Sequence, residues 1–425
     1  MSERKFSPSG TVLIFAGLAL GILAGGFLPE DTHPFAYKLF QFLAKAFVGL
    51  IKGLIVPLLF ATLVTGIAQT GDLKAVGRIG GKALLYFEIV TTLALAIGLV
   101  VGNTLKPGAH MPLDLSASPV VTGKAAPTGW DIAYHAIPTS LVRHAAEGEI
   151  LPFVVFASLF GVALVRVGGE HAAPVFRFFD GVARAMFKYT DMIMKLTPLG
   201  VFGAMAYNVS HMAGAHEGMR GWPAVGHLLG EYARLVGSLH LALLLLFVLV
   251  MVPLMLVLRV PVFGFLRAIR DPLLTAYSTA SSEAALPRLL EDVVAFGVPR
   301  RIAGFVIPAG YSFNLDGSTL YLVLASLTIA QAAHVEMSVG QQIVMVLSFM
   351  LTSKGVAGVP RATLVIIAGT CDGFGLPGEA GTAMLLAVDG IMDMARTVVN
   401  VTGNALASVV ISKWEGAFGE RDDAT

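Results

Sequence analysis

Cysteine and charge are both scarce in this chain of 425 residues. The single cysteine, Cys371, excludes an intramolecular disulfide framework and a cysteine-rich metal site. Charged residues make up 13% of the sequence, about half of the ~25% that is usual in soluble domains. The formal net charge of +1 leaves no basic excess of the kind that nucleic-acid binding requires. The remainder is strongly apolar, with 56% hydrophobic residues, and indicates an integral membrane protein made of helices.

Motifs of the common enzyme classes are also absent from the sequence. It contains no HExxH helix, no nucleotide-binding loop and no Cys/His cluster, and its ten histidines show no metal-ligand spacing. We therefore expect neither an intramembrane enzyme nor an ATP-driven pump, and we expect no cofactor.

Long apolar runs predict the first half of the fold. Residues 11–28 and 237–258 contain no charged side chain, and each run can cross a hydrocarbon core of about 30 Å. The six helices are expected at about residues 11–28, 37–69, 83–105, 150–167, 182–209 (interrupted at 198–200) and 233–258. The polar residues 106–149 are expected to form a long extracytoplasmic loop.

Positive charges indicate the orientation of these helices. Arg4 and Lys5 precede the first apolar run, and Lys74, Arg78 and Lys82 follow the second helix. By the positive-inside rule, both clusters lie in the cytoplasm, and so does the N-terminus. The residues after the first run form a poor cleavage site, so we interpret it as a retained helix rather than a signal peptide.

Two later segments, residues 273–293 and 344–367, are too polar at their centres to span a membrane. Each precedes a longer helix with an embedded polar core, expected at residues 309–324 and 381–412. Interrupted segments at corresponding positions are typical of inverted repeats around a transporter's binding site. Irregular backbone is tolerated at membrane depth only where protein or a water-filled cavity satisfies it. We therefore expect two re-entrant hairpins that meet tip to tip.

A polar stretch lies inside the last long apolar helix. At 100° per residue, one helix face presents Asp389, Asp393, Thr397, Asn400 and Asn404. Arg396 borders this face. Ionisable groups at membrane depth are costly and mark a functional site by default. A guanidinium and a carboxylate one turn apart predict a ligand that carries both signs of charge.

Four motifs resemble, in their order, the glutamate-transporter family of dicarboxylate/amino acid:cation symporters. They are Ser278–Pro287, Ser312–Thr319, Gly355–Pro360 and Asp393–Asn404. The Asn-x-Asp-Gly and Asp-x-x-Arg-Thr-x-x-Asn runs are specific in combination. The resemblance covers nearly the whole chain and is strongest toward bacterial proton-coupled glutamate/aspartate symporters.

The resemblance implies an all-α membrane protein with eight transmembrane helices and two re-entrant helical hairpins, assembled as a homotrimer in the bacterial inner membrane. Residues 1–258 would hold six helices, mostly a trimerisation scaffold, with the third and sixth joining the transport unit. Residues 259–416 would form the transport core, and residues 417–425 a polar cytoplasmic tail. The transport unit would slide across the membrane like an elevator.

The resemblance also implies roles for the charged residues. Arg396 would hold the substrate's side-chain carboxylate through a bidentate guanidinium fork, with Asp389 orienting it from behind. The alternative is a structural ion pair of Arg396 with Asp389 or Asp393. Asp393 would hold the substrate's ammonium group, which favours aspartate or glutamate over a C4-dicarboxylate.

Further substrate contacts are implied at the hairpin tips and beside them: Ser282, Val359, Pro360, Thr397, Asn400 and Ser318. Close helix packing is the alternative explanation for the small residues among them. Arg361 and Lys354 flank the second tip, and their roles stay open between attracting anions, holding a gate and snorkelling to the interface.

Remnants of the family's cation sites are implied at Gly310, Asn314, Asp316, Asn400 and Asn404. Asn404 stands where sodium-driven relatives have Asp, and Phe87 and Val90 replace Tyr and Thr oxygens. Proton coupling is therefore favoured over sodium coupling.

The candidate proton carriers are Glu283 at the first hairpin tip and Glu88, expected to be buried in the third helix. Burial raises a carboxyl pKa and makes proton carriage possible. The alternatives are a hairpin hydrogen bond for Glu283 and pairing with a neighbouring helix for Glu88.

The function expected is secondary active symport of glutamate or aspartate with protons. A sodium-coupled or C4-dicarboxylate carrier of the same family is the first alternative. An anion channel is the alternative from another class, but a gated pore has no need of a matched Asp393/Arg396 pair.

Overall fold

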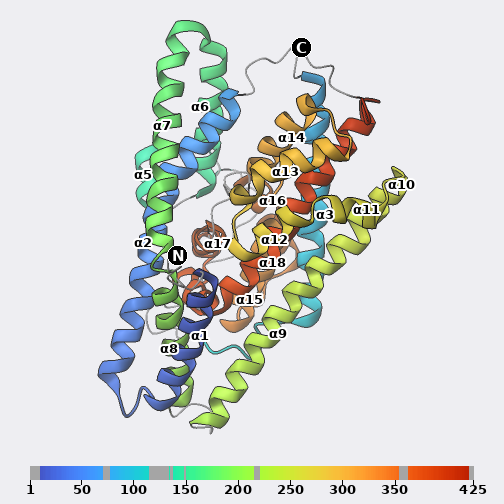
Figure 1. The fold of residues 1–425 in the computed structure, drawn as a ribbon. Helices are drawn as coiled ribbons and strands as arrows, with labels where there is room; N and C mark the ends of the chain where they lie inside the picture. Colours follow the sequence, from blue (N-terminus) through green and yellow to red (C-terminus); the bar gives the residue numbers. More distant parts are fainter. Residues whose placement is uncertain are drawn as a thin grey trace, which may run out of the picture.

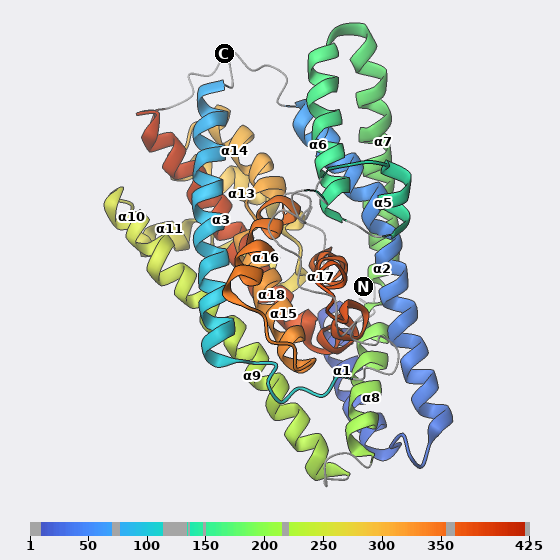
Figure 2. The ribbon, with the colours of Figure 1, turned by 180° about the vertical axis from the view of Figure 1, so that it is seen from behind.

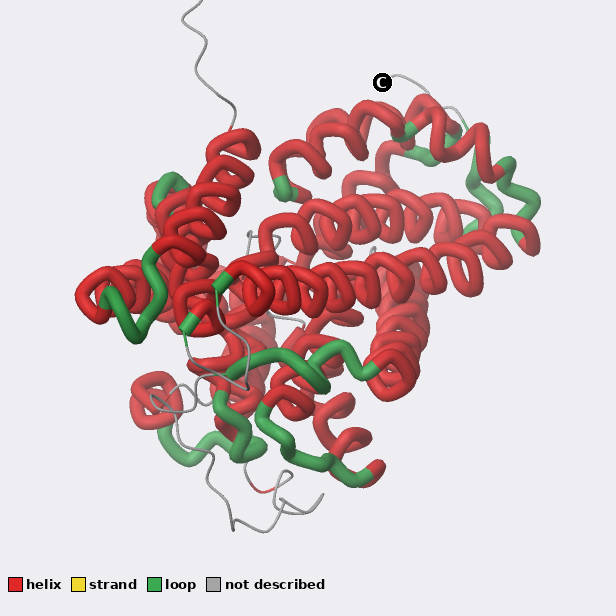
Figure 3. Tube along the Cα trace, turned by 90° about the horizontal axis from the view of Figure 1, so that it is seen from below, coloured by secondary structure: helices red, strands yellow, loops and turns green. Residues whose placement is uncertain are grey.

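The architecture is that of a helical bundle, seen in a computed structural model that describes residues 10–69, 77–113, 134, 137–147, 150–214, 221–353 and 362–420. Within these ranges every regular element is a helix, as predicted (Figures 1 and 3). The first half contains α1 (Gly10–Phe27), α2 (Pro34–Gln69), α3 (Gly77–Leu105), α5 (Leu141–Glu147), α6 (Ile150–Val167), α7 (Gly169–Met194) and α8 (Thr197–Ala213). The second half contains α9 (Trp222–Leu246), the π-helix η1 (Phe247–Met251), α10 (Val252–Val257), α11 (Val262–Ala268), α12 (Arg270–Thr279), α13 (Ser282–Phe296), α14 (Arg300–Phe313), α15 (Asp316–Ala332), α16 (Val339–Thr352), α17 (Ala362–Gly373) and α18 (Gly378–Trp414).

The helices pack in two groups that lie side by side (Figures 1 and 2). In one group, α2 contacts α6, α7 and α8, and α1 packs along α8. The other group contains the helices from α12 onward. It also contains α3 and α9, which pack against α15 and α18 although these are far away in sequence. The groups meet most extensively where α8 contacts α18, and α1, α2 and α6 also touch helices of the second group.

Three helical stretches are long and apolar enough to cross a membrane, judged by length and composition: Arg78–Leu105, Trp222–Val257 and Arg300–Ala332. The eight spans expected from the family resemblance stay a prediction.

Two predicted helices of the first half have different bounds in the structure. The helix expected at residues 182–209 is two helices, α7 and α8, which meet at Lys195 and Leu196. The first turns of α7 are polar and carry charged side chains, so the search for apolar runs did not predict a helix there. The helix expected at residues 233–258 begins earlier, at Trp222. The prediction placed its start too late because Glu231 and Arg234 interrupt the hydrophobic pattern of its first half.

The segment expected to form the first hairpin contains α12 and α13, which pack against each other. The chain turns at Ala280, whose φ of 50° lies in the left-handed region that non-glycine residues seldom adopt. Ser281 then caps α13, its hydroxyl accepting a hydrogen bond from the Ala284 N–H at 3.3 Å. The segment expected to form the second hairpin contains α16 and α17, and its expected tip, residues 355–360, falls outside the described residues.

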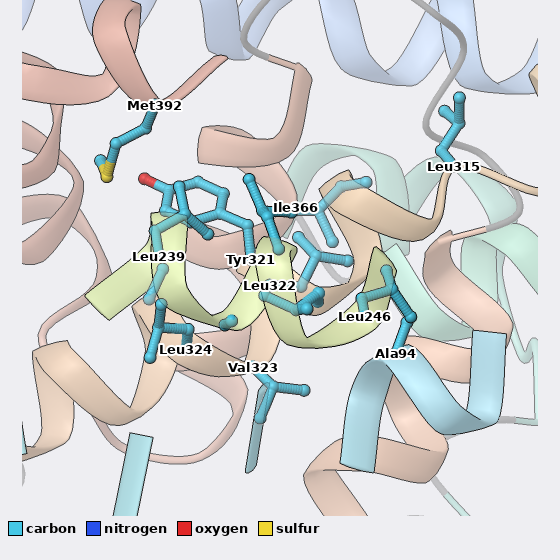
Figure 4. Packing of buried hydrophobic residues seen from close by; sticks show 14 of the residues in the cluster. Ala94, Leu239, Leu246, Leu315, Tyr321, Leu322, Val323, Leu324, Ile366 and Met392 are labelled. Atoms are coloured by element: carbon cyan, nitrogen blue, oxygen red, sulfur yellow. The ribbon is translucent and has the colours of Figure 1, made fainter. Parts of the chain in front are cut away.

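The helix expected at residues 309–324 is broken. α14 ends at Phe313 and α15 begins at Asp316, with Asn314 and Leu315 in non-helical conformations between them. α15 is buried on all sides, from Asp316 to Ala330, as expected for a helix at the centre of a bundle. Figure 4 shows this packing in side chains from five helices: Tyr321, Leu322, Val323 and Leu324 of α15, Leu239 and Leu246 of α9, Ala94 of α3, Ile366 of α17 and Met392 of α18.

Candidate functional site

The polar residues of α18 turn toward the protein interior. The predicted shared face is present, and every member of it is buried: Asp389, Asp393, Arg396, Thr397, Asn400 and Asn404. The face is covered by α14, α15 and α17, which all pack against α18. None of these side chains is available to lipid.

Arg396 is the centre of the site, and its side chain is 0% exposed. Its Nη2 lies 3.0 Å from Asp389 Oδ1 and 2.8 Å from Asp393 Oδ1. Its Nη1 donates a hydrogen bond of 3.1 Å to Thr363 Oγ1 on α17. The guanidinium carbon lies 3.9 Å from the centre of the Tyr321 ring, a cation–π contact.

Both ion pairs that sequence reasoning held as an alternative are therefore formed. A buried guanidinium requires such partners, because removing an unpaired charge from water costs several kcal/mol. Two carboxylates therefore pair with the same nitrogen of one guanidinium. A carboxylate in such a cluster can also accept a hydrogen bond from an ammonium group or take up a proton.

Asn400 joins α18 to the start of α15. Its Oδ1 accepts hydrogen bonds from the backbone N–H groups of Gly317 at 2.9 Å and Ser318 at 3.2 Å. Its Nδ2 donates to Ser318 Oγ at 2.9 Å. The first N–H groups of a helix have no partner inside the helix, so Asn400 stabilises the break before α15. The approach is close, since a Cβ on Gly317 would lie 2.7 Å from the Arg396 carbonyl oxygen.

A second polar cluster lies one turn further along α18. Asn314 Nδ2 donates to Asn404 Oδ1 at 3.2 Å, and both side chains are fully buried. A Cβ on Gly403 would lie 2.8 Å from Asp316 Oδ2 and 3.5 Å from Asn314 Nδ2. A Cβ on Gly310 would collide with Asn404 Oδ1. The predicted cation-site remnants are thus brought together.

This cluster offers hard oxygen atoms to a cation. Asp316 supplies a buried carboxylate, and Asn314 Oδ1 has no hydrogen-bond partner among the described residues. No group of three or more His, Cys, Asp or Glu side chains that could hold a metal occurs in the described part of the chain. The donor set therefore suits a monovalent cation or a proton better than a transition metal.

Of the remaining predicted substrate residues, some have defined positions in the structure and others lie outside the described residues. Ser282 is buried at the start of α13, and both arms of the first hairpin pack against α18. Thr397 donates its hydroxyl hydrogen to the Asp393 carbonyl at 2.7 Å, inside its own helix. Val359, Pro360, Lys354 and Arg361 lie outside the described residues.

The two candidate proton carriers are more accessible than the charged cluster. Glu283 is exposed in the first turn of α13. Glu88 is partly exposed, so the prediction that it is buried in the third helix was wrong. α3 buries the face that carries Phe87 and Val90, while the neighbouring Ile89 is 53% exposed, and Glu88 lies at the edge between these faces.

A crevice lies elsewhere, where α2 and α8 meet the first turns of α18. Its lining comes from both groups of helices: Gln41, Ala44, Lys45, Pro112, Leu113, Tyr207, Asn208, Glu379, Ala380, Ala383 and Met384. Arg396 is not part of its wall.

Sequence reasoning missed two contacts of Arg396. Tyr321 and Thr363 reach the guanidinium from α15 and α17, 75 and 33 residues away in sequence. Thr363 was visible only as a hydroxyl in an apolar run, which is common in membrane helices and carries little signal.

Comparison with known proteins identifies the family of this chain. The sequence matches the sodium:dicarboxylate symporter family over residues 11–414. A proton/glutamate-aspartate symporter of Escherichia coli K12 is 38% identical, covering 99% of this chain and 96% of that protein. A proton/sodium-glutamate symport protein of Bacillus caldotenax is 38% identical over 96% of this chain and 94% of its own. A C4-dicarboxylate transport protein of Laribacter hongkongensis is 40% identical over 98% and 92%. The chain therefore belongs to the sodium:dicarboxylate symporter family of membrane transporters.

Proposed function

We propose that this chain is a secondary active symporter that imports glutamate or aspartate together with protons. The observation that carries the proposal is the buried cluster of Asp389, Asp393 and Arg396, which brings both signs of charge together inside the protein. Proteins named proton/glutamate-aspartate symporter and proton/sodium-glutamate symport protein are among its relatives.

The charges of the cluster match a zwitterionic diacid. Arg396 can give charge-assisted hydrogen bonds to the substrate's side-chain carboxylate, and Asp393 can accept from its ammonium group. In the arrangement seen here the two side chains satisfy each other at 2.8 Å. A substrate that carries both charges can replace each partner, so neither side chain is left as an unpaired buried charge.

A C4-dicarboxylate is the second candidate substrate, because the Laribacter hongkongensis relative is named for it. Such a molecule has no ammonium group that could pair with Asp393. The buried Asp393 therefore favours the amino acid.

Protons are favoured as the coupling ion over sodium. Asn404 contributes a neutral amide to the second cluster. Phe87 and Val90, both buried on α3, contribute no oxygen. Asp316, Glu283 and Glu88 are the acids that could carry a proton, and sodium coupling stays the alternative.

For the transport cycle we propose an elevator. The scaffold would consist of α1, α2, α6, α7 and α8, and the moving unit of α3 with α9 to α18, following the two packed groups. Under this proposal residues 1–258 are mostly scaffold, residues 259–416 are the transport core and residues 417–425 are a cytoplasmic tail. We further propose a homotrimer in the bacterial inner membrane, with the N-terminus in the cytoplasm.

The test is uptake by purified protein in liposomes. Radiolabelled aspartate and glutamate are offered with an inward proton gradient, an inward sodium gradient or neither, against succinate as the comparison substrate. We expect acidic amino acids to accumulate when the outside is acidified. Uptake that needs sodium and ignores the pH gradient would overturn the proton assignment, and accumulation of succinate alone would overturn the substrate assignment.

A further inference from the structure

The hydroxyl of Thr363 links the second hairpin to the guanidinium. Thr363 is the second residue of α17, the arm that follows the expected hairpin tip, and its side chain is buried. It accepts the hydrogen bond of Arg396 Nη1 at 3.1 Å. Among the described residues, this is the hydrogen bond that joins Arg396 to an element other than α18.

The donors of Arg396 are only partly used. A guanidinium has five N–H groups. Nη2 serves the two aspartates and Nη1 serves Thr363, but Nε has no hydrogen-bond partner among the described residues although it is fully buried. An N–H left without a partner in such surroundings costs about 1–3 kcal/mol. The guanidinium is therefore prepared for one more acceptor.

The hydroxyl hydrogen of Thr363 has no acceptor among the residues that the structure describes. A threonine hydroxyl has one O–H donor and two acceptor lone pairs. The bond from Arg396 uses one lone pair. A carboxylate beside the guanidinium could thus receive hydrogen bonds from Arg396 and from Thr363 together.

We propose that Thr363 is a specificity-determining residue for substrates with a side-chain carboxylate. Its hydroxyl accepts from Arg396 Nη1 and donates to the carboxylate that Arg396 binds. Because Thr363 lies on the hairpin arm, the carboxylate also connects α17 to α18. This inference rests on the proposed function, in which Arg396 binds that carboxylate.

The test compares Thr363→Val with Thr363→Ser in transport assays. Valine keeps the branched shape and removes the hydroxyl, whereas serine keeps the hydroxyl. Thr328→Val is the matched control, since Thr328 is also buried but donates to the Leu324 carbonyl of its own helix at 2.7 Å. For each variant, KM and kcat are measured for aspartate and glutamate, and inhibition of aspartate uptake is measured for asparagine and glutamine.

Loss of a hydrogen bond to a charged group predicts a rise of about tenfold in KM for the acidic substrates in Thr363→Val. Inhibition by the amides should stay within about twofold of wild type, because they lack the carboxylate, and Thr363→Ser should restore KM. An equal change for acids and amides, or no change, would overturn the role of Thr363. If wild-type protein fails to transport acidic amino acids at all, the proposed function itself is wrong. Thermal melting in detergent distinguishes a folding defect from loss of this substrate contact. A folding defect would lower the melting temperature and leave the ratio of acid to amide affinity unchanged.

Discussion

Asp389 and Arg396 lie seven residues apart on α18 and form an ion pair of 3.0 Å in which both side chains are completely buried. Two helical turns bring them to one face. Asp393 shares the same nitrogen of Arg396 at 2.8 Å. One acid can therefore exchange its partner for substrate while the other keeps the guanidinium in place.

Asp389 is expected to act by orienting Arg396. Asp389→Asn keeps an oxygen acceptor, so we expect a rise of a few-fold in KM for aspartate and nearly normal thermal melting. Asp389→Ala removes the acceptor and leaves a cavity, and we expect a loss of about 2–4 kcal/mol in stability together with weak uptake. The measurements are proteoliposome uptake and melting in detergent. Equal behaviour of the two variants would contradict an orienting role.

Arg396 should be indispensable for acidic substrates. Arg396→Ala leaves two buried carboxylates facing each other, so Arg396→Lys serves as the variant that keeps the charge. We expect uptake of aspartate to be lost in the first and to fall by about a hundredfold in the second, because lysine cannot form a planar bidentate fork. Elution as a single folded species on size-exclusion chromatography is the control. Full retention of uptake by either folded variant would remove Arg396 from the site.

Asp393 should distinguish amino acids from dicarboxylates. Asp393→Ser removes the acceptor for the ammonium group, and we expect aspartate affinity to fall by about a hundredfold, the value of a strong charge-assisted hydrogen bond. Succinate, which has no ammonium group, should lose less than about threefold. Competition against labelled aspartate measures both. Parallel losses for the two ligands would show that Asp393 does not bind the ammonium group.

Gly403 is expected to be necessary for the polar cluster around Asp316. A Cβ at this position would lie 2.8 Å from Asp316 Oδ2, so Gly403→Ala must displace the carboxylate. We expect transport to fall by more than about tenfold, since loss of one good buried interaction is worth about 1–3 kcal/mol. Gly304→Ala is the matched control on α14, because a Cβ added there would have no neighbouring atom within 4 Å among the described residues. Normal transport by Gly403→Ala would exclude Asp316 from the coupling site.

Glu415 holds the start of α3 and the end of α18 together. Its carboxylate forms ion pairs with Lys82 at 2.6 Å and with Arg78. The hydrogen bond from Lys82, with further help from Arg78, lowers the pKa of Glu415 below its ordinary value. The pairs therefore stabilise the folded protein above the unfolded-state pKa of about 4.3, and this stabilisation is lost as pH falls through the lowered pKa.

Thermal melting of wild type and Glu415→Gln tests this pH dependence. We expect wild type to melt at a higher temperature at pH 7, and the difference to vanish as the pH falls below about 4. Glu420→Gln is the control, since Glu420 pairs with Arg301 at an exposed position and such pairs contribute little. A difference that persists or grows in acid would contradict the assignment.

Much of the site was predictable because it lies on one helix. Asp393, Thr397 and Asn400 share a face through the helical repeat alone, and the structure confirms it. The family resemblance then placed Asn314 and Asp316 near Asn404. The contacts of Arg396 with Tyr321 and Thr363 could not be foreseen, because they depend on how α15 and α17 cross α18.

The predicted helix bounds and the predicted burial of side chains were wrong where the polarity of a segment does not match its burial in the structure. The first half of α7 is helical although it is polar, and α15 is buried although Asp316 and Ser318 begin it. Glu88 was expected to be buried from its place in an apolar helix, but the packing of α3 leaves it at an edge. Local hydrophobicity reports the chance that a side chain is buried, whereas the neighbouring helices decide which face is covered.

By itself the sequence determined that this protein is helical and bound to membranes, and that one helix carries opposite charges on one face, because composition and the 3.6-residue repeat are local properties. Only the tertiary structure decided that Arg396 pairs with both Asp389 and Asp393, that Asn400 stabilises the break before α15, and that Thr363 reaches the guanidinium. Those contacts join helices far apart in the chain, and a buried charge selects its partners from whatever the packing brings within hydrogen-bond distance.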